Sequence, residues 1–277
     1  MALGVCSWSL KPANGDELLQ LVSSLGVKAI QIALDPFRRG ESGWRIDEFG
    51  AAARNAGVEI RSGMIGMLGE DYSTLQTIRD TGGVRLDANW RENLANANAS
   101  ADIAARLGVP LVTFHAGFFP EAESDPIRRV MLDRIRAIHD VFAARGVRVG
   151  LETGQETATT LLAALRDLDV PVGVNFDPAN ILLYGMGDPI DALRRLAPHV
   201  AQAHIKDARR SRAVGEWGED VVVGTGEVNF AAMFDVMREA GARVDYMIER
   251  ERGKARIEDI QTALAHVRPL MEQAEVA

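Results

Sequence analysis

Hydrophobic positions along the chain recur in one order. A short run rich in β-branched residues is followed by a polar loop and then by a longer amphipathic segment. Apolar residues repeat every second position in a half-buried strand and every three to four positions in a surface helix. The pattern therefore predicts an α/β protein in which strands and helices alternate.

The positions of these runs define the elements. Strands are predicted to begin near residues 3, 27, 58, 109, 147, 170, 200 and 244. Helices are predicted over Asp16–Leu25, Ile46–Ala56, Asp87–Leu107, Pro126–Ala144, Thr157–Leu168, Pro189–Leu196, Phe230–Ala240 and Ile257–Met271. Several of them end in a glycine just before the next strand, as in "RLGVPLV", because glycine readily adopts the left-handed conformation that ends a helix.

Eight such strands and eight helices follow one another without a linker or a shift in composition. This count favours a single (β/α)₈ TIM barrel over residues 1–277, since an open doubly wound sheet has no preference for eight strands. The segment "GMLGEDYSTLQTIRDTGGVRL" after the third strand is longer than a usual connection. Two interpretations stay open for it: a lid over the substrate, or a surface elaboration without a role.

Composition and charge exclude some functions. The chain has 277 residues, 47% of them hydrophobic, and a formal net charge of −8, which argues against a nucleic-acid partner. It has no apolar stretch near the roughly 18 residues of a membrane helix, and "MALGVCSWSLKP" lacks a signal-peptide pattern. A cytoplasmic protein without a membrane partner is expected.

The single cysteine, Cys6, is interpreted as a small apolar residue of the first strand.

Ionisable side chains end five consecutive predicted strands, where a barrel of this kind places its active site. They are His115, Glu152, Asp177, His204 and Glu249. Each has an ordinary explanation by itself; Asp177, for example, precedes Pro178 and could cap a helix. Together, however, carboxylates without a cation would repel one another. Glu152, Asp177, His204 and Glu249 form an oxygen-rich set that suits Mn²⁺ or Mg²⁺, with Co²⁺ or Zn²⁺ as alternatives.

Five motifs in order along the chain carry a family resemblance: "LETG", "NFDPAN", "HIKDA", "GTGEVNF" and "MIERE". With them the chain resembles the sugar-phosphate isomerase/epimerase superfamily of xylose-isomerase-like barrels, including ketose 3-epimerases and inosose dehydratases. The resemblance implies a divalent metal, Mn²⁺ first, held by Glu152, Asp177, His204 and Glu249. It also implies proton abstraction next to a carbonyl, with Glu152 and Glu249 as the acid/base groups and a small carbohydrate as substrate.

Further residues are candidates for contact with that substrate. The resemblance implies Arg210, with Arg209 competing for the role, and His115 at the end of the fourth strand. The alternatives are a surface arginine for Arg210 and a hydrogen-bonded core histidine for His115. Lys206 shares a strand face with His204 and could polarise a substrate oxygen or balance the carboxylates, whereas Asp207 would point away or lie in the loop.

Asn180 departs from the pattern, because ketose 3-epimerases often carry a substrate-binding histidine three residues after the metal aspartate. Asparagine can donate and accept hydrogen bonds but carries no proton at neutral pH, so the substrate is expected to differ from a free ketohexose. Glu156 is expected to cap the following helix, with contact to a substrate hydroxyl as the alternative. Trp8, Trp44 and Trp217 are candidates for apolar walls around a sugar ring, or for packing.

The leading hypothesis is a metal-dependent sugar or sugar-phosphate isomerase/epimerase. The alternative is a lyase or dehydratase acting on an inosose or a 3-keto-glycoside, which would expel a leaving group from the same enediolate. A phosphodiesterase of the apurinic endonuclease type is disfavoured, because it needs several zinc ions and more histidines at the mouth. A noncatalytic metal-binding barrel is disfavoured by the two acid/base glutamates. Assembly into a homo-oligomer stays open.

Overall fold

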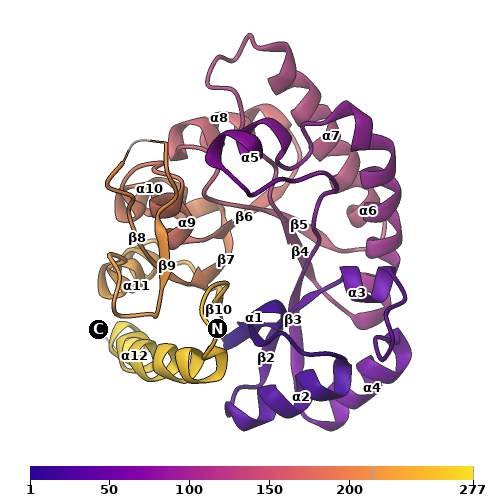
Figure 1. Ribbon diagram of the computed structural model, residues 1–277, viewed down its shortest axis with the longest axis vertical. Coiled ribbons are helices and arrows are strands. Elements are labelled where there is room, and N and C mark those ends of the chain that lie inside the picture. The colour runs from indigo at the N-terminus through magenta and orange to yellow at the C-terminus, as the bar shows by residue number, and fades with distance from the viewer. Residues whose placement is uncertain (214, 277) are drawn as a thin grey trace.

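Eight parallel strands close into a barrel in the computed structural model, which describes residues 1–213 and 215–276 (Figure 1). The barrel strands are β1 (Leu3–Cys6), β2 (Ala29–Ala33), β3 (Glu59–Met64), β4 (Leu111–Phe114), β5 (Arg148–Glu152), β6 (Val172–Phe176), β7 (Val200–Ile205) and β10 (Asp245–Ile248). Around the barrel their order is β1, β10, β7, β6, β5, β4, β3, β2. The predicted (β/α)₈ barrel and its strands are confirmed.

Helices form an outer ring around these strands (Figure 1). They are α2 (Gly15–Ser24), α4 (Ile46–Asn55), α6 (Asp87–Leu107), α7 (Pro126–Ala143), α8 (Ala158–Leu168), α10 (Pro189–Leu196), α11 (Phe230–Glu239) and α12 (Arg256–Val276). Seven of the eight agree with the predicted bounds to within one residue at each end, while α12 extends beyond the predicted Met271. Among the described helices, none combines the length and the apolar character needed to cross a bilayer.

Short elements that the hydrophobic pattern did not predict lie mostly after the carboxyl ends of strands. They are α1 (Ser7–Leu10), α3 (Asp35–Arg38), α5 (Leu75–Thr81), α9 (Pro178–Leu183), a 3₁₀ turn (Ala197–His199), and the antiparallel pair β8 (Asp207–Arg209) and β9 (Glu219–Val221). Most have fewer residues than two helical turns, so they give no periodic signal. They build the rim of the barrel mouth.

The apolar core lies between the barrel and its ring of helices, where large side chains such as Phe114, Phe142 and Phe176 are fully buried. Trp44 belongs to this core: its ring packs edge-on against Phe37 at a centroid distance of 5.2 Å and also contacts Phe49. The interpretation of Trp44 as a wall of the sugar site is therefore wrong. A large aromatic side chain is buried here for its apolar area.

Candidate metal centre

Four buried ionisable side chains meet at the carboxyl ends of neighbouring strands. Glu152 is the last residue of β5, Asp177 follows β6, His204 is the last residue but one of β7, and Glu249 follows β10. One ligand atom from each lies within 4.8 Å of those of the other three. The structure thus brings together all four residues proposed as ligands; that they bind a metal stays a prediction.

The buried charges of this quartet are unbalanced. Lys206 Nζ donates to Glu249 Oε2 at 2.8 Å, and it also contacts the carboxylate of Glu251. Burial acts to raise the pKa of Glu249, but the charges of Lys206 and His204 outweigh burial and hold that pKa well below its usual range. Burial raises the pKa of Asp177 despite the nearby Lys206. Lys206 and His204 together therefore do not offset the desolvation of all three carboxylates, and a divalent cation fits the set.

A polar layer inside the barrel orients the imidazole of His204. Its Nε2 lies 2.8 Å from Gln31 Oε1, which can only accept, so Nε2 carries the proton. Nδ1 then faces the carboxylates, 3.2 Å from Asp177 Oδ2, and would bind a metal there in place of its own proton. Gln31 is itself fixed, because its Nε2 donates to Thr113 Oγ1 at 2.8 Å and its Oε1 accepts from Gln202 Nε2 at 2.9 Å. Such support is what a metal-binding histidine requires.

These amides were not predicted from the sequence, although a signal was present. Gln31 and Gln202 are the polar residues of "AIQIA" and "VAQA", two otherwise apolar strand segments. A similar signal existed for Glu251, which is two residues after Glu249 and so lies on the same side of an extended chain. Polar residues within apolar barrel strands indicate groups that support a site.

Asn180 holds two members of this cluster in place. Its Nδ2 donates to Glu152 Oε1 at 3.0 Å, and its Oδ1 accepts from Lys206 Nζ at 3.1 Å. The other oxygen of Glu152 accepts from Asn175 Nδ2 at 3.1 Å, and His115 Nε2 lies 3.5 Å from Oε1. Asn180 and His115 also border the mouth cavity, where their predicted contact with substrate stays a prediction.

Trp8 contacts the quartet from the opposite side. Its Nε1 donates to Glu249 Oε1 at 2.6 Å, and its ring lines the mouth. The mouth is a cavity of about 520 Å³ that also borders Trp217 and, from the insertion after β3, Glu70 and Tyr72. The insertion is thus part of the wall of the site. The volume lies within the range of about 300–1,000 Å³ typical of small-molecule sites.

The structure does not bring Arg210 to the mouth. Its Nε is 3.4 Å from the carboxylate of Glu227, and its Nη2 is 3.9 Å from that of Asp188. Arg209 also turns away, donating to the carbonyl oxygen of Thr225. Arg210 is not among the residues that border the mouth, because β8 begins directly after Lys206; its contact with substrate stays a prediction. Asp207 points away as expected; its carboxylate accepts from backbone N–H groups of the "GTGEVNF" segment.

Glu156 does not cap the helix that follows it. The side chain of Thr157 caps α8 by accepting from the Thr160 N–H. Glu156 is 7% exposed, its Oε1 has no hydrogen-bond partner among the described residues, and burial raises its pKa to about 8. At neutral pH the carboxyl is therefore mainly protonated, which makes it a donor.

The buried Glu156 predicts how stability changes with pH. Its pKa is raised from 4.5 to about 8 on folding, so between these values only the folded chain holds the proton, and the free energy of unfolding falls as pH rises. We expect a decrease on the order of a few kcal/mol from this group. Urea unfolding of wild type and Glu156→Gln between pH 5 and 8 measures it. The free energy of unfolding should depend less on pH in the variant than in wild type. An equal dependence in both proteins would contradict a raised pKa for Glu156.

Comparison with known proteins gives a family match over most of the chain. The family model for the xylose isomerase-like TIM barrel matches residues 19–270. A xylose isomerase domain protein from Planctomyces limnophilus is similar, with 30% sequence identity, a TM-score of 0.87 and coverage of 100% of this chain and 98% of that one.

More distant structures share the fold. An L-ribulose 3-epimerase is 18% identical, with a TM-score of 0.76 and coverage of 100% and 96%. The "probable 3-DHS dehydratase AsbF" from Bacillus anthracis is 19% identical, with a TM-score of 0.74 and coverage of 97% and 100%.

The uncharacterized protein YihM of Escherichia coli (strain K12) is 25% identical over 147 residues, 51% of this chain. The match spans only 45% of that curated relative.

Proposed function

Because the chain belongs to the xylose isomerase-like TIM barrel family, we propose that it is a divalent-metal-dependent isomerase or epimerase of a small carbohydrate. The observation that carries this proposal is the quartet: three carboxylates and one oriented imidazole, buried at the ends of four neighbouring strands. The similarity to a solved L-ribulose 3-epimerase supports the same class of reaction.

The quartet residues Glu152, Asp177, His204 and Glu249 would hold the metal, with Mn²⁺ as the first candidate and Mg²⁺, Co²⁺ or Zn²⁺ as alternatives. When bound, a divalent cation supplies Lewis-acid stabilisation of the negative charge that develops on a carbonyl oxygen. The hydrogen bonds of the protein select the ligand atoms. His204 would present Nδ1, because its Nε2–H donates to Gln31 Oε1.

Glu152 and Glu249 are the proposed acid/base groups, with one carboxylate removing a proton from carbon and the other returning a proton. They project from β5 and β10, the outer two of the four neighbouring strands. If the proton returns to the opposite face of the same carbon, the reaction is an epimerisation. If it returns to the neighbouring carbon, the reaction is an isomerisation. Asn180 orients Glu152, while Trp8 and Lys206 orient Glu249. A carboxylate held by such donors is already in place for proton transfer, so the site need not rearrange during the reaction.

Loss of the indole donor gives one test. Trp8→Phe keeps an aromatic ring at the mouth but removes the hydrogen bond to Glu249 Oε1. We expect kcat/KM to fall by about ten- to a hundredfold, because a hydrogen bond to a charged group contributes about 1.5–3 kcal/mol. With its Oε1 unpartnered, the Glu249 carboxylate should also gain basicity, so the acid limb of the pH profile of kcat/KM should move to higher pH. An unchanged rate and profile would contradict a role for Trp8.

The second candidate is a metal-dependent lyase or dehydratase. Asn180 favours it, since this side chain joins Glu152 to Lys206 at a position where ketose 3-epimerases often have a histidine. The similar fold of the "probable 3-DHS dehydratase AsbF" agrees with an elimination on this scaffold. Mass spectrometry of the products separates the two reactions, because elimination releases water or an alcohol and epimerisation conserves mass.

A further inference from the structure

A second cavity adjoins the mouth of the barrel. It has a volume of about 980 Å³ and is bordered by Phe118, by Gln155 and Glu156 after β5, and by the carboxyl end of α9. Leu183 and Tyr184 line both this cavity and the mouth. A molecule that extends from the mouth past Tyr184 would therefore enter the second cavity.

Two buried polar groups on its wall lack partners. Glu156 Oε1 and Gln155 Oε1 make no hydrogen bond among the described residues, although the two side chains are only 7% and 1% exposed. Nearly all buried polar atoms in proteins are hydrogen-bonded, so a pair of orphans in one wall indicates a missing partner. The protonated carboxyl of Glu156 can donate and the amide oxygen of Gln155 can accept. Hydroxyl groups satisfy both at once.

Aromatic rings form another part of the wall. Phe118 and Tyr184 pack edge to face at a centroid distance of 5.7 Å, and Tyr184 also contacts Trp217 at 4.9 Å. Flat apolar faces beside hydrogen-bonding groups match a sugar ring, which presents C–H bonds on its faces and hydroxyls at its edge.

The charges around the cavity argue against an anionic ligand. The guanidinium of Arg79 lies over the Phe118 ring, Arg85 donates to the Phe118 carbonyl oxygen, and Arg210 pairs with Glu227. Carboxylates of Asp80, Glu121, Asp125 and Glu216 border the same space. These four carboxylates balance the four arginines that border the space, which include Arg212. A phosphate would gain little here.

We propose that this cavity binds a second, uncharged sugar ring, so that the substrate is a glycoside whose reacting ring lies in the mouth. The proposal rests on the function proposed above, because the ring in the second cavity is joined to the ring that is chemically changed. It narrows the substrate class from sugars in general to neutral glycosides of two rings.

Binding of non-reacting sugars tests the proposal without catalysis. Calorimetric titration of the Mn²⁺-supplemented protein with D-glucose, maltose and cellobiose should give at least one disaccharide with about tenfold higher affinity than glucose, as expected from two added hydrogen bonds. Glu156→Leu should reduce this ratio to about twofold or less and leave glucose affinity unchanged. Leucine has a similar size and removes an unpartnered buried carboxyl, so the variant should fold; Glu156→Gln serves as the second variant.

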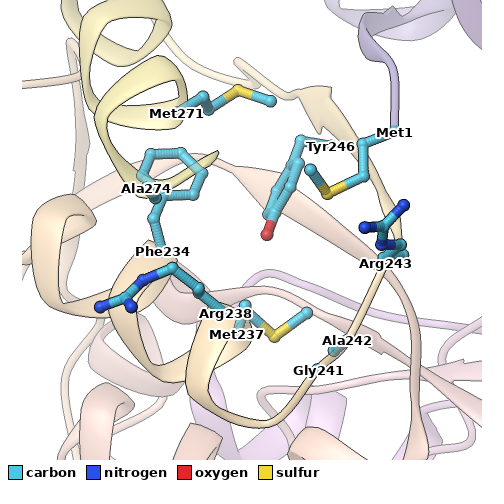
Figure 2. A pocket seen from close by; sticks show the side chains of 10 residues that line it. All are labelled: Met1, Phe234, Met237, Arg238, Gly241, Ala242, Arg243, Tyr246, Met271 and Ala274. Carbon is cyan, nitrogen blue, oxygen red and sulfur yellow. The ribbon is translucent and has the colours of Figure 1, made fainter. Parts of the chain in front are cut away.

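A control comes from a cavity of about 670 Å³ elsewhere on the barrel, bordered by α11, α12 and the segment before β10. Figure 2 shows the Tyr246 ring between the side chains of Met1 and Phe234 in this cavity. Since Gly241–Arg243 precede β10, it lies toward the amino ends of the strands, away from the mouth. Arg238→Ala changes its wall and should bind all three sugars as wild type does.

Each outcome bears on the proposal. Equal affinity for one ring and two, a ratio unchanged in Glu156→Leu, or no binding of any of these sugars would overturn it. Tighter binding of glucose 1-phosphate than of both disaccharides would overturn it in favour of an anion. If a disaccharide binds as expected but no sugar exchanges hydrogen with solvent, the proposed reaction fails and the second-ring site stands.

Discussion

Glu249→Gln is expected to lower the exchange of substrate hydrogen with solvent deuterium by at least about a thousandfold. General acid/base catalysis by one group is worth roughly 10²–10⁴ in rate, and the same change weakens the donor set for the metal. The loss should lie in kcat, because glutamine keeps the size of the side chain and can still accept from Trp8. Proton NMR of a ketose or keto-glycoside in D₂O measures the exchange, and Glu152→Gln should show a loss of similar size.

Glu251→Gln is the matched control for this experiment. Its carboxylate contacts Lys206, as Glu249 does, but its side chain is 53% exposed and it lies outside the quartet. Loss of a half-exposed carboxylate should change the rate by less than about tenfold. Circular dichroism should show a folded barrel for all three variants. Full exchange in folded Glu249→Gln, or equal losses in both Glu249→Gln and Glu251→Gln, would refute the assignment of Glu249.

Removal of the metal is expected to abolish activity and to lower the melting temperature. Ligand present at about 100 times its Kd stabilises a folded protein by about 2.7 kcal/mol. For a chain of this size such a change corresponds to roughly 5–10 °C in Tm. A thermal shift assay after dialysis against EDTA, with and without added Mn²⁺, measures the effect. Comparison of Mn²⁺, Mg²⁺, Co²⁺ and Zn²⁺ then ranks the candidate ions.

Asp177→Asn separates the metal-binding role of this residue from its structural role. Asparagine keeps an oxygen that accepts from the Asn180 N–H at the start of α9, as Asp177 Oδ1 does. It removes one of the three buried charges, so the metal-free variant should melt no lower than metal-free wild type. The shift with Mn²⁺ should disappear, together with activity. A wild-type shift in this variant would show that the ion binds elsewhere.

The barrel could be predicted well because its signals are local. Each strand is marked by a short apolar run rich in β-branched residues, each helix by its own period, and many of the junctions by glycines. Glu152, Asp177, His204 and Glu249 could be grouped from the sequence alone, since each stands at the end of a strand and the carboxyl ends of barrel strands converge. Their closeness is therefore a consequence of topology and not of a particular loop.

The remaining contacts depend on loops, whose paths have no comparable period. Arg210 follows a strand, but β8 directs the chain toward Glu227. Glu156 stands where a cap is expected, yet Thr157 takes that place and leaves the glutamate buried. The supporting role of Gln31 depends on Gln202, which is 171 residues away along the chain. Pairings between distant polar side chains become visible only when the barrel closes.

Asp177 divides two tasks between its two oxygens: Oδ1 accepts from the Asn180 N–H and starts α9, while Oδ2 faces His204 Nδ1. Serine, threonine or asparagine could perform the first task without a charge, and glutamate offers the charge but is a poor cap. Saturation mutagenesis should therefore find a single fully functional amino acid here. Tyr184 follows α9 directly and borders both cavities. A substitution of Asp177 that displaces the start of α9 would therefore also alter the passage between the cavities. Selectivity for substrates and affinity for the ion should then vary together in any set of variants at this position.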